Sequence, residues 1–131
     1  MNPGRTILAV LVGYLTLIVL EVLGGAILGS AMRVRIGGSS AMIGGEVVVL
    51  LSGLAAGAMT ARLAPSRRLA HATALALTIV SAASLASAIA KPPAHHLYPG
   101  WYSYALALFG GVGAFVGGVL VSSKSDETDS L

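Results

Sequence analysis

The chain has 131 residues, of which 56% are hydrophobic and 10% are charged, and its formal net charge is +3. Soluble domains carry about 25% charged residues, so this chain has too few to cover a water-facing surface, and the lipid bilayer is its expected solvent. The small, scattered positive charge argues against nucleic acid as a partner. The absence of cysteine excludes disulfides, thiolate metal sites and cysteine nucleophiles.

Four apolar runs account for most of the chain. They cover residues 6–32, 41–64, 69–90 and 101–122. Each is long enough to cross a hydrocarbon core of roughly 30 Å as an α-helix, which takes about 20 residues. Prolines and basic residues lie between these runs or at their ends, as expected of helix boundaries. The sequence therefore predicts an all-α integral membrane protein, an up-down-up-down bundle of four transmembrane helices over residues 1–122, with a disordered acidic tail over 123–131.

The first run has a second interpretation. Arg5, the apolar stretch and the small residues at 29–31 are also typical of a secretory signal with its cleavage site. The stretch is longer than the roughly 7–15 residues of a signal's apolar region, and Glu21 interrupts it. We therefore expect a membrane span that is retained.

The basic residues are divided unequally between the two ends of the runs. One end carries Arg5, Arg62, Arg67, Arg68 and Lys124. The other end carries Arg33, Arg35 and Lys91. Because cytoplasmic loops hold the excess of lysine and arginine, both termini are expected in the cytoplasm. Near the start of the last run an aromatic cluster is expected to anchor the chain at the headgroup layer. It consists of Tyr98, Trp101, Tyr102 and Tyr104.

Glycines spaced four residues apart recur in three of the runs. The pairs are Gly25 and Gly29, Gly53 and Gly57, and Gly113 and Gly117. Membrane helices associate through close packing of small residues, because lipid tails compete with apolar side chains for every other contact. These six glycines are therefore candidate helix-packing positions. The spacing leaves open whether the contacts are made within the chain or between copies.

Glu21 lies near the middle of the first run, where an ionised carboxylate costs at least ~2.5–3.5 kcal/mol. Arg62 stands at the end of the second run and no lysine or arginine lies in the interior of any run, so a protonated, hydrogen-bonded acid is favoured. The candidate partners are Tyr14, Thr78, Ser81 and Ser84. Because Glu21 shares a helix face with Gly25, we expect it to point at another helix. It would either handle a ligand or proton, or fix the helix register through one hydrogen bond.

Glu46 lies close to the outer end of the second run, on one helical stripe with Gly53, Gly57 and Thr60. The stripe turns Glu46 towards the packed interior. If the first two helices are neighbours, Glu21 and Glu46 would open towards one cavity. The same two roles, ligand or proton site and structural polar group, stay open for Glu46.

The histidines do not form a recognisable metal site. His95 and His96 are adjacent but have no third ligand at a suitable spacing, and His71, beside Arg67 and Arg68, is expected among lipid headgroups. We predict no metal and no cofactor. The chain has neither a phosphate-binding glycine loop after a strand nor a serine-nucleophile motif, so we also predict that it is not an enzyme.

Two stretches resemble a known group of proteins. In "GLAAGAMTARLAPSRRLAHATALAL" and "YPGWYSYALALFGGVGAFVGG", a small-residue helix ends in an "A-R-x-A-P" turn, a histidine opens the next helix, and "P-x-W-Y" opens the last. This pattern is similar to small four-span bacterial inner-membrane proteins of unknown function. The resemblance covers roughly the last two thirds of the chain before the tail, and it implies a fold and a bacterial origin but no activity.

The segment "LEVLGGA" around Glu21 also resembles the first helix of small multidrug resistance exporters. Those exporters have four short helices and a glutamate in the first, and they work as antiparallel dimers with proton exchange. Only Glu21 matches: residues 41–90 contain no Trp, Tyr or Phe where the exporters place aromatic residues, and the loop "AKPPAHHLYPG" is longer than theirs. The resemblance is therefore one of architecture.

The sequence favours a small bacterial inner-membrane protein with a structural or accessory role. Its expected partners are the lipid bilayer and either further copies of the chain or another membrane protein. The alternative function is a proton-coupled transporter of small molecules or cations that uses Glu21, assisted by Glu46 and Tyr14.

Overall fold

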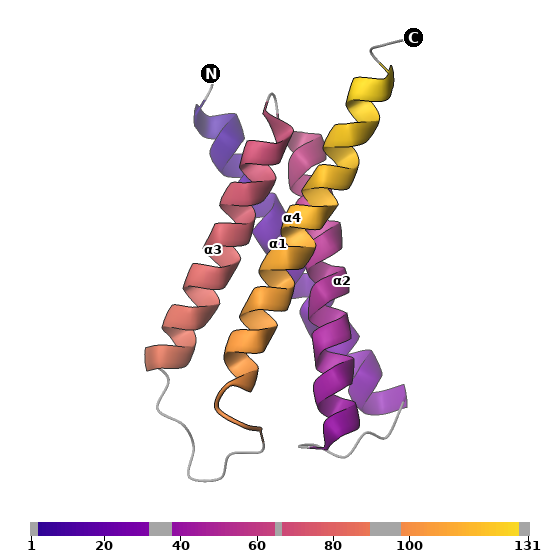
Figure 1. The fold of residues 1–131 in the computed structure, drawn as a ribbon, viewed down its shortest axis with the longest axis vertical. Helices are drawn as coiled ribbons and strands as arrows, with labels where there is room; N and C mark the ends of the chain where they lie inside the picture. The colour runs from indigo at the N-terminus through magenta and orange to yellow at the C-terminus, as the bar shows by residue number, and fades with distance from the viewer. Residues whose placement is uncertain (1–2, 32–37, 65–66, 90–97, 129–131) are drawn as a thin grey trace.

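The computed structural model describes residues 3–31, 38–64, 67–89 and 98–128. Four helices fill these segments: α1 spans Pro3–Ala31, α2 spans Ser39–Leu63, α3 spans Arg68–Ile89 and α4 spans Tyr102–Thr128 (Figure 1). The described segments contain no strand. By length and composition, each helix is apolar enough to cross a bilayer. The chain is a multi-pass membrane protein, and the predicted all-α bundle of four spans is confirmed.

Most helix ends follow the breakers in the sequence. Pro3 opens α1, where its missing N–H costs nothing, and α2 ends at Leu63, shortly before Pro65. The end of α4 differs from the expected disordered tail, because the helix continues past Ser122 to Thr128. Neither Gly nor Pro follows Gly118, so nothing in this stretch breaks the helix. Residues 129–131 lie outside the described segments.

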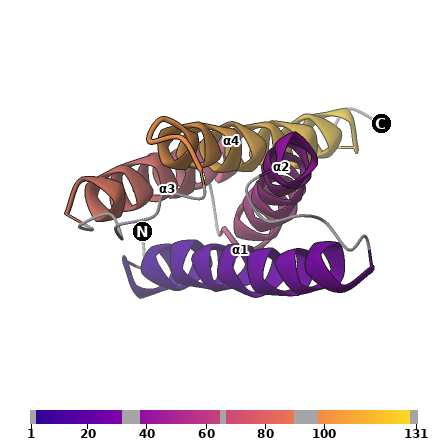
Figure 2. The same cartoon turned by 90° about the horizontal axis from the view of Figure 1, so that it is seen from below.

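The helices run up and down, so α1 begins and α4 ends at the same end of the bundle (Figure 1), which we call the terminal end. Seen along the bundle, α1 lies on one side of α2 and the α3–α4 pair lies on the other (Figure 2). The contact between α2 and α4 is the most extensive, followed by α3–α4 and α1–α2. Within the described segments, α1 does not touch α4. The bundle is therefore a three-helix core of α2, α3 and α4, with α1 laid across α2.

Glycines allow the backbones of α2 and α4 to touch. A Cβ added at Gly57 would overlap the backbone of Ala114, and one added at Gly117 would overlap the backbone of Leu54. Gly53 and Gly113 face the partner backbone in the same way. The structure thus places all four glycines of these two pairs at the α2–α4 contact, where van der Waals packing between backbones holds membrane helices together.

α4 also carries glycines towards α3. A Cβ at Gly111 would come within 2.5 Å of Val80 Cγ2, and one at Gly118 would overlap Ala72 Cβ. Because α4 presents glycines on two faces, α2 and α3 both approach it closely. This explains why α4 is the central helix of the core.

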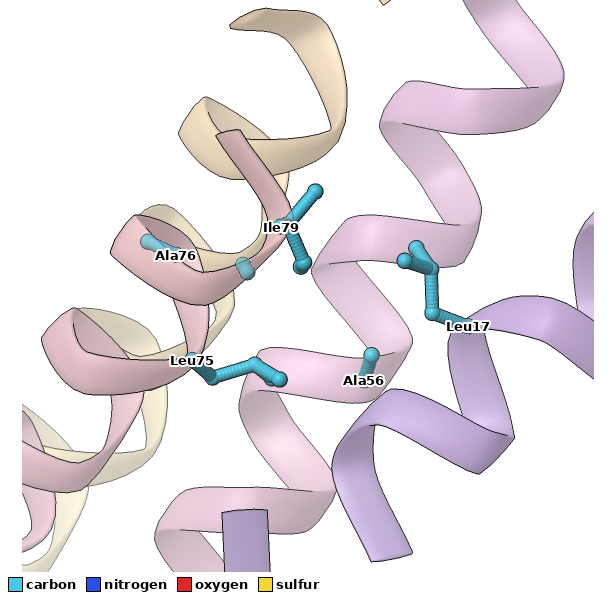
Figure 3. Packing of buried hydrophobic residues seen from close by; sticks show 6 residues of the cluster. Leu17, Ala56, Leu75, Ala76 and Ile79 are labelled. Atoms are coloured by element: carbon cyan, nitrogen blue, oxygen red, sulfur yellow. The ribbon is translucent and has the colours of Figure 1, made fainter. Parts of the chain in front are cut away.

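The buried cluster at the middle of the bundle is made of short side chains. It consists of Leu17, Ala56, Leu75, Ala76, Ile79 and Ala114, with Val10 and Tyr14 packed against it (Figure 3). All four helices contribute to it, and α1 does so chiefly through Leu17. The large apolar side chains, by contrast, lie mainly on the outside, as expected when lipid replaces water around the bundle.

Candidate functional site

The contact of α1 with its neighbours follows one stripe of residues. A Cβ at Gly13 would overlap Thr60 Oγ1, and one at Gly24 would lie 2.6 Å from Val48 Cγ1. Towards the C-terminal end of α1, Leu28 fills the space over Gly44. With the buried Leu17, these positions are four, seven and four residues apart, as residues of one helix face are.

Gly25 and Gly29 do not belong to this stripe. A Cβ at either position would meet no atom within 4 Å, so Gly25 and Gly29 make no close helix contact within the described segments of the single chain, and packing between copies stays a prediction. The physical reason is helical rotation: successive residues are about 100° apart, so the face that turns Gly24 towards α2 turns Gly25 away. Both glycines are exposed.

Glu21 lies at the edge between these two faces. It is half-buried, four residues after Leu17 and three before Gly24 on the contact stripe, and four before the uncovered Gly25. Within the described segments, its carboxyl group forms no hydrogen bond or ion pair. Glu21 is therefore a polar group near mid-span to which the described segments supply no partner.

None of the partners expected for Glu21 is bonded to it in the described segments. Tyr14 packs against the buried cluster, and the Thr78 hydroxyl donates to the carbonyl of Ala74, at 2.8 Å, in its own helix. Ser81 is exposed and Ser84 is half-buried, and the structure joins neither of them to Glu21. For Thr78, the helix backbone therefore takes the hydroxyl that Glu21 would need.

Glu46 lies in a different environment from Glu21. It is half-buried on α2, and its electrostatic neighbour is Tyr102 at the start of α4. No hydrogen bond or ion pair joins the two glutamates. The structure makes α1 and α2 neighbours, as expected, yet it turns one acid to the edge of α1 and the other towards α4.

Tyr102 is the centre of a small aromatic cluster. Its ring stacks on Tyr98 at 5.0 Å and meets Trp101 edge to face at 6.1 Å. Its hydroxyl donates to the carbonyl of Met42 at 2.9 Å, and it passes over Gly45, where a Cβ would overlap it. Trp101 remains 57% exposed. This arrangement suits an anchor that fixes the start of α4 to α2 at the membrane boundary.

Replacing Tyr102 with phenylalanine tests this anchor. We expect Tyr102→Phe to lower the free energy of unfolding by about 0.5–1.5 kcal/mol, because it removes one hydrogen bond and keeps the ring packing. Denaturation by SDS titration in mixed micelles measures this change. The matched control is Tyr104→Phe on the 45% exposed Tyr104; an equal loss in the control would contradict the assigned role of the Met42 bond.

His71 joins α3 to α1. The ring is buried, its Nδ1 lies 3.1 Å from the Arg67 carbonyl, and its Nε2 lies 3.2 Å from Thr6 Oγ1. A carbonyl only accepts hydrogen bonds, so Nδ1 carries a proton, and in the neutral ring Nε2 accepts from the Thr6 hydroxyl. His71 was expected among headgroups, and this link was missed. The sequence signal that could have indicated the burial of His71 is its position on one helix stripe with Ala72, Leu75 and Ile79.

Thr60 is a second polar residue in the interior of the bundle. It is 0% exposed, and its Oγ1 is the buried side-chain atom that lacks a hydrogen-bond partner within the described segments. It points at Gly13, where α1 crosses α2. The stripe that links Glu46, Gly53, Gly57 and Thr60 predicts its burial, but nothing in the sequence indicates which helix covers it.

Some predicted positions lie outside the described segments. These are Arg33, Arg35, Lys91, His95 and His96. Among the residues that are described, no three histidine, aspartate or glutamate side chains gather as they would around a metal ion. The candidate site is therefore Glu21 together with the side of α1 that carries Gly25 and Gly29, over which no described atom lies within 4 Å.

No family model, curated protein or solved structure matches this chain. The four spans and the side chains that they position are therefore the features that indicate a function.

Proposed function

We propose that the chain is a structural or accessory membrane subunit, not an enzyme, which assembles through one side of α1. This side, the free face of α1, consists of Glu21, Gly25 and Gly29 with the exposed Ile18 and Val22. Their spacing of three and four residues places them side by side along the helix. The assembly would contain either several copies of the chain or another membrane protein.

The single observation that supports this proposal best is the unpartnered carboxyl group of Glu21 beside two uncovered glycines. A carboxylate near mid-bilayer costs at least ~2.5–3.5 kcal/mol. A neighbouring helix would stabilise it, because hydrogen bonds between membrane helices contribute about 0.6–2 kcal/mol. Gly25 and Gly29 would let that helix approach closely, since no side chain of this chain fills the space over them.

The proposed location is the bacterial inner membrane with both termini in the cytoplasm. The bacterial origin follows from the resemblance of the "A-R-x-A-P" and "P-x-W-Y" segments to small inner-membrane proteins. The orientation follows from the excess of basic residues at the terminal end, which carries Arg5, Arg62, Arg67 and Arg68.

Replacing the two free-face glycines with leucine tests the assembly. We expect the wild-type protein, extracted from its membrane without detergent, to have a particle mass above that of one chain, and Gly25→Leu/Gly29→Leu to reduce it to one chain. The leucines fill space that a partner helix needs, whereas the fold tolerates them because no atom lies within 4 Å. Native mass spectrometry measures the mass, and circular dichroism confirms that helicity is unchanged.

The matched control is Ala70→Leu/Ala74→Leu, which adds the same bulk at the same spacing on exposed positions of α3. This variant should assemble like the wild type. A wild-type particle that contains one chain only would contradict the proposal, and so would an assembly that survives the leucines at 25 and 29.

The second candidate function is proton-coupled transport of small molecules or cations. The observation that favours it is the same free carboxyl group, because an acid without a fixed partner is available to exchange a proton for a ligand. In this case purified protein should release protons when organic cations are added, and Glu21→Gln should abolish the release while Glu46→Gln preserves most of it. Proton release that persists in Glu21→Gln would eliminate this mechanism.

A further inference from the structure

The terminal end of the bundle brings arginines of two helices together. Thr6 of α1 and His71 of α3 are joined by a hydrogen bond of 3.2 Å, so the first turns of these two helices lie side by side. Arg5 directly precedes Thr6, and Arg68 and Arg67 lie three and four residues before His71. Residues three apart share a helix face, so Arg68 stands one turn before His71 on the side of α3 that meets α1, and Arg67 directly precedes the helix.

These guanidinium groups have no partner within the described part of the chain. None of the three takes part in a hydrogen bond or ion pair through its side chain. The two carboxylates with described side chains, Glu21 and Glu46, lie elsewhere, on the middle of α1 and near Tyr102. Both ring nitrogens of His71 are already occupied. Among the side chains that the structure describes, the positive charge at this end therefore has no counter-charge.

The position of the arginines along the helices determines which anion they meet. Arg5 stands in the first turn of α1, and Arg68 is the first residue of α3, so all three arginines lie where the apolar spans begin. That boundary is where lipid phosphates are found, and basic pockets between transmembrane helices bind anionic headgroups. Arg68 is half-buried and Arg5 and Arg67 are exposed, so one guanidinium is held by packing while two remain accessible from the bilayer surface.

We propose that the first turns of α1 and α3 form a binding site for the headgroup of an anionic phospholipid, with Arg5, Arg67 and Arg68 as its phosphate ligands. Guanidinium groups bind phosphate through two parallel N–H donors each. The Thr6–His71 hydrogen bond holds the two turns at a fixed separation and so positions the arginines. The partial positive charge at the start of a long helix, α3, adds to their attraction for the phosphate.

Lipid titration in detergent tests this site. Phosphatidylglycerol added to the purified full-length protein is expected to raise its melting temperature more than phosphatidylcholine does, and the preference should shrink in about 0.5 M salt because surface charges are screened. Arg67→Gln/Arg68→Gln should weaken phosphatidylglycerol binding roughly 10- to 30-fold, since each arginine near the surface contributes about one kcal/mol. Arg67→Lys/Arg68→Lys keeps the charge but loses the paired N–H donors, so its binding should lie between that of the wild type and that of the glutamine variant.

Two control experiments decide whether these arginines form a specific site for a phospholipid headgroup. Arg33→Gln/Arg35→Gln removes the same charge between α1 and α2 in the sequence and should leave the phosphatidylglycerol preference intact; an equal loss would show a response to overall charge and overturn the site. Millimolar inorganic phosphate alone should not stabilise the protein. Stabilisation by phosphate as strong as that by phosphatidylglycerol would overturn the lipid assignment, and unchanged lipid binding in Arg67→Gln/Arg68→Gln would overturn the site itself.

Discussion

Gly57→Ala is expected to destabilise the bundle by about 1–3 kcal/mol, the usual cost of forcing extra atoms into a packed core. The added Cβ would overlap the backbone of Ala114. Backbone atoms cannot rotate away as the end of a side chain does, so α2 and α4 would have to separate and lose van der Waals contact along their length. The free energy of unfolding from SDS titration in mixed micelles measures the effect.

The sign of this change is informative, because alanine is ordinarily the better helix former by about one kcal/mol. Gly25→Ala is the matched control: no atom lies within 4 Å of its added Cβ. Under detergent conditions in which the protein is a single chain, this variant should be as stable as the wild type or slightly more so. A stable Gly57→Ala beside a destabilised Gly25→Ala would contradict the helix contacts described above.

Gly13→Ala is expected to have an effect of similar size at the place where α1 crosses α2. Its Cβ would overlap Thr60 Oγ1, and it would lie 3.0 Å from Leu75 Cδ2 and 3.2 Å from the Ala56 carbonyl oxygen. Thr60 is fully buried, so its hydroxyl has little free volume into which to move. We expect a loss of about 1–3 kcal/mol in the free energy of unfolding, measured by the same SDS titration.

A double-mutant cycle with Thr60 identifies the cause. Thr60→Ala removes the overlapping oxygen, which has no hydrogen-bond partner, so Gly13→Ala/Thr60→Ala should be more stable than the sum of the two single changes by about 0.5–3 kcal/mol. Thr60→Ser keeps the oxygen and should give no such rescue. Additive effects in both cycles would show that Gly13 and Thr60 are not in contact.

The four spans could be predicted from the sequence because length and hydrophobicity decide whether a helix crosses a bilayer. The pairs Gly53 and Gly57 on α2, and Gly113 and Gly117 on α4, could also be picked out, because a spacing of four residues marks a face on which backbones can approach. The end of α4 was less predictable: an acidic, serine-rich composition suggested disorder, but a sequence without Gly or Pro continues the helix to Thr128.

Which face of α1 packs against α2 could not be predicted. Gly24 and Leu28 form one possible contact stripe and Gly25 and Gly29 another, and both have helical spacing. In water the more polar face would turn outwards, but lipid is as apolar as the interior, so hydrophobicity does not select between them. The depth of Glu21 near mid-span could be predicted, because depth follows from the position of a residue along its span. The helix beside Glu21 could not be predicted, because it depends on which stripe of α1 packs.

His71 illustrates the same limit. Its hydrogen bond to Thr6 joins residues far apart in the chain, and the neighbouring Arg67 and Arg68 suggested a headgroup contact instead. The structure shows that His71 points inwards to α1, while Arg67 and Arg68 precede it at the terminal end.

We propose that the free face of α1 is covered by another protein helix in the membrane. Photo-crosslinking in intact membranes tests it most directly, with a photoreactive amino acid placed at Gly25 and, as a control, at the exposed Ala74 of α3. We expect position 25 to give a covalent adduct with a second copy of the chain or with one defined membrane protein, and position 74 to react with lipid only. Lipid adducts alone at position 25 would contradict the claim.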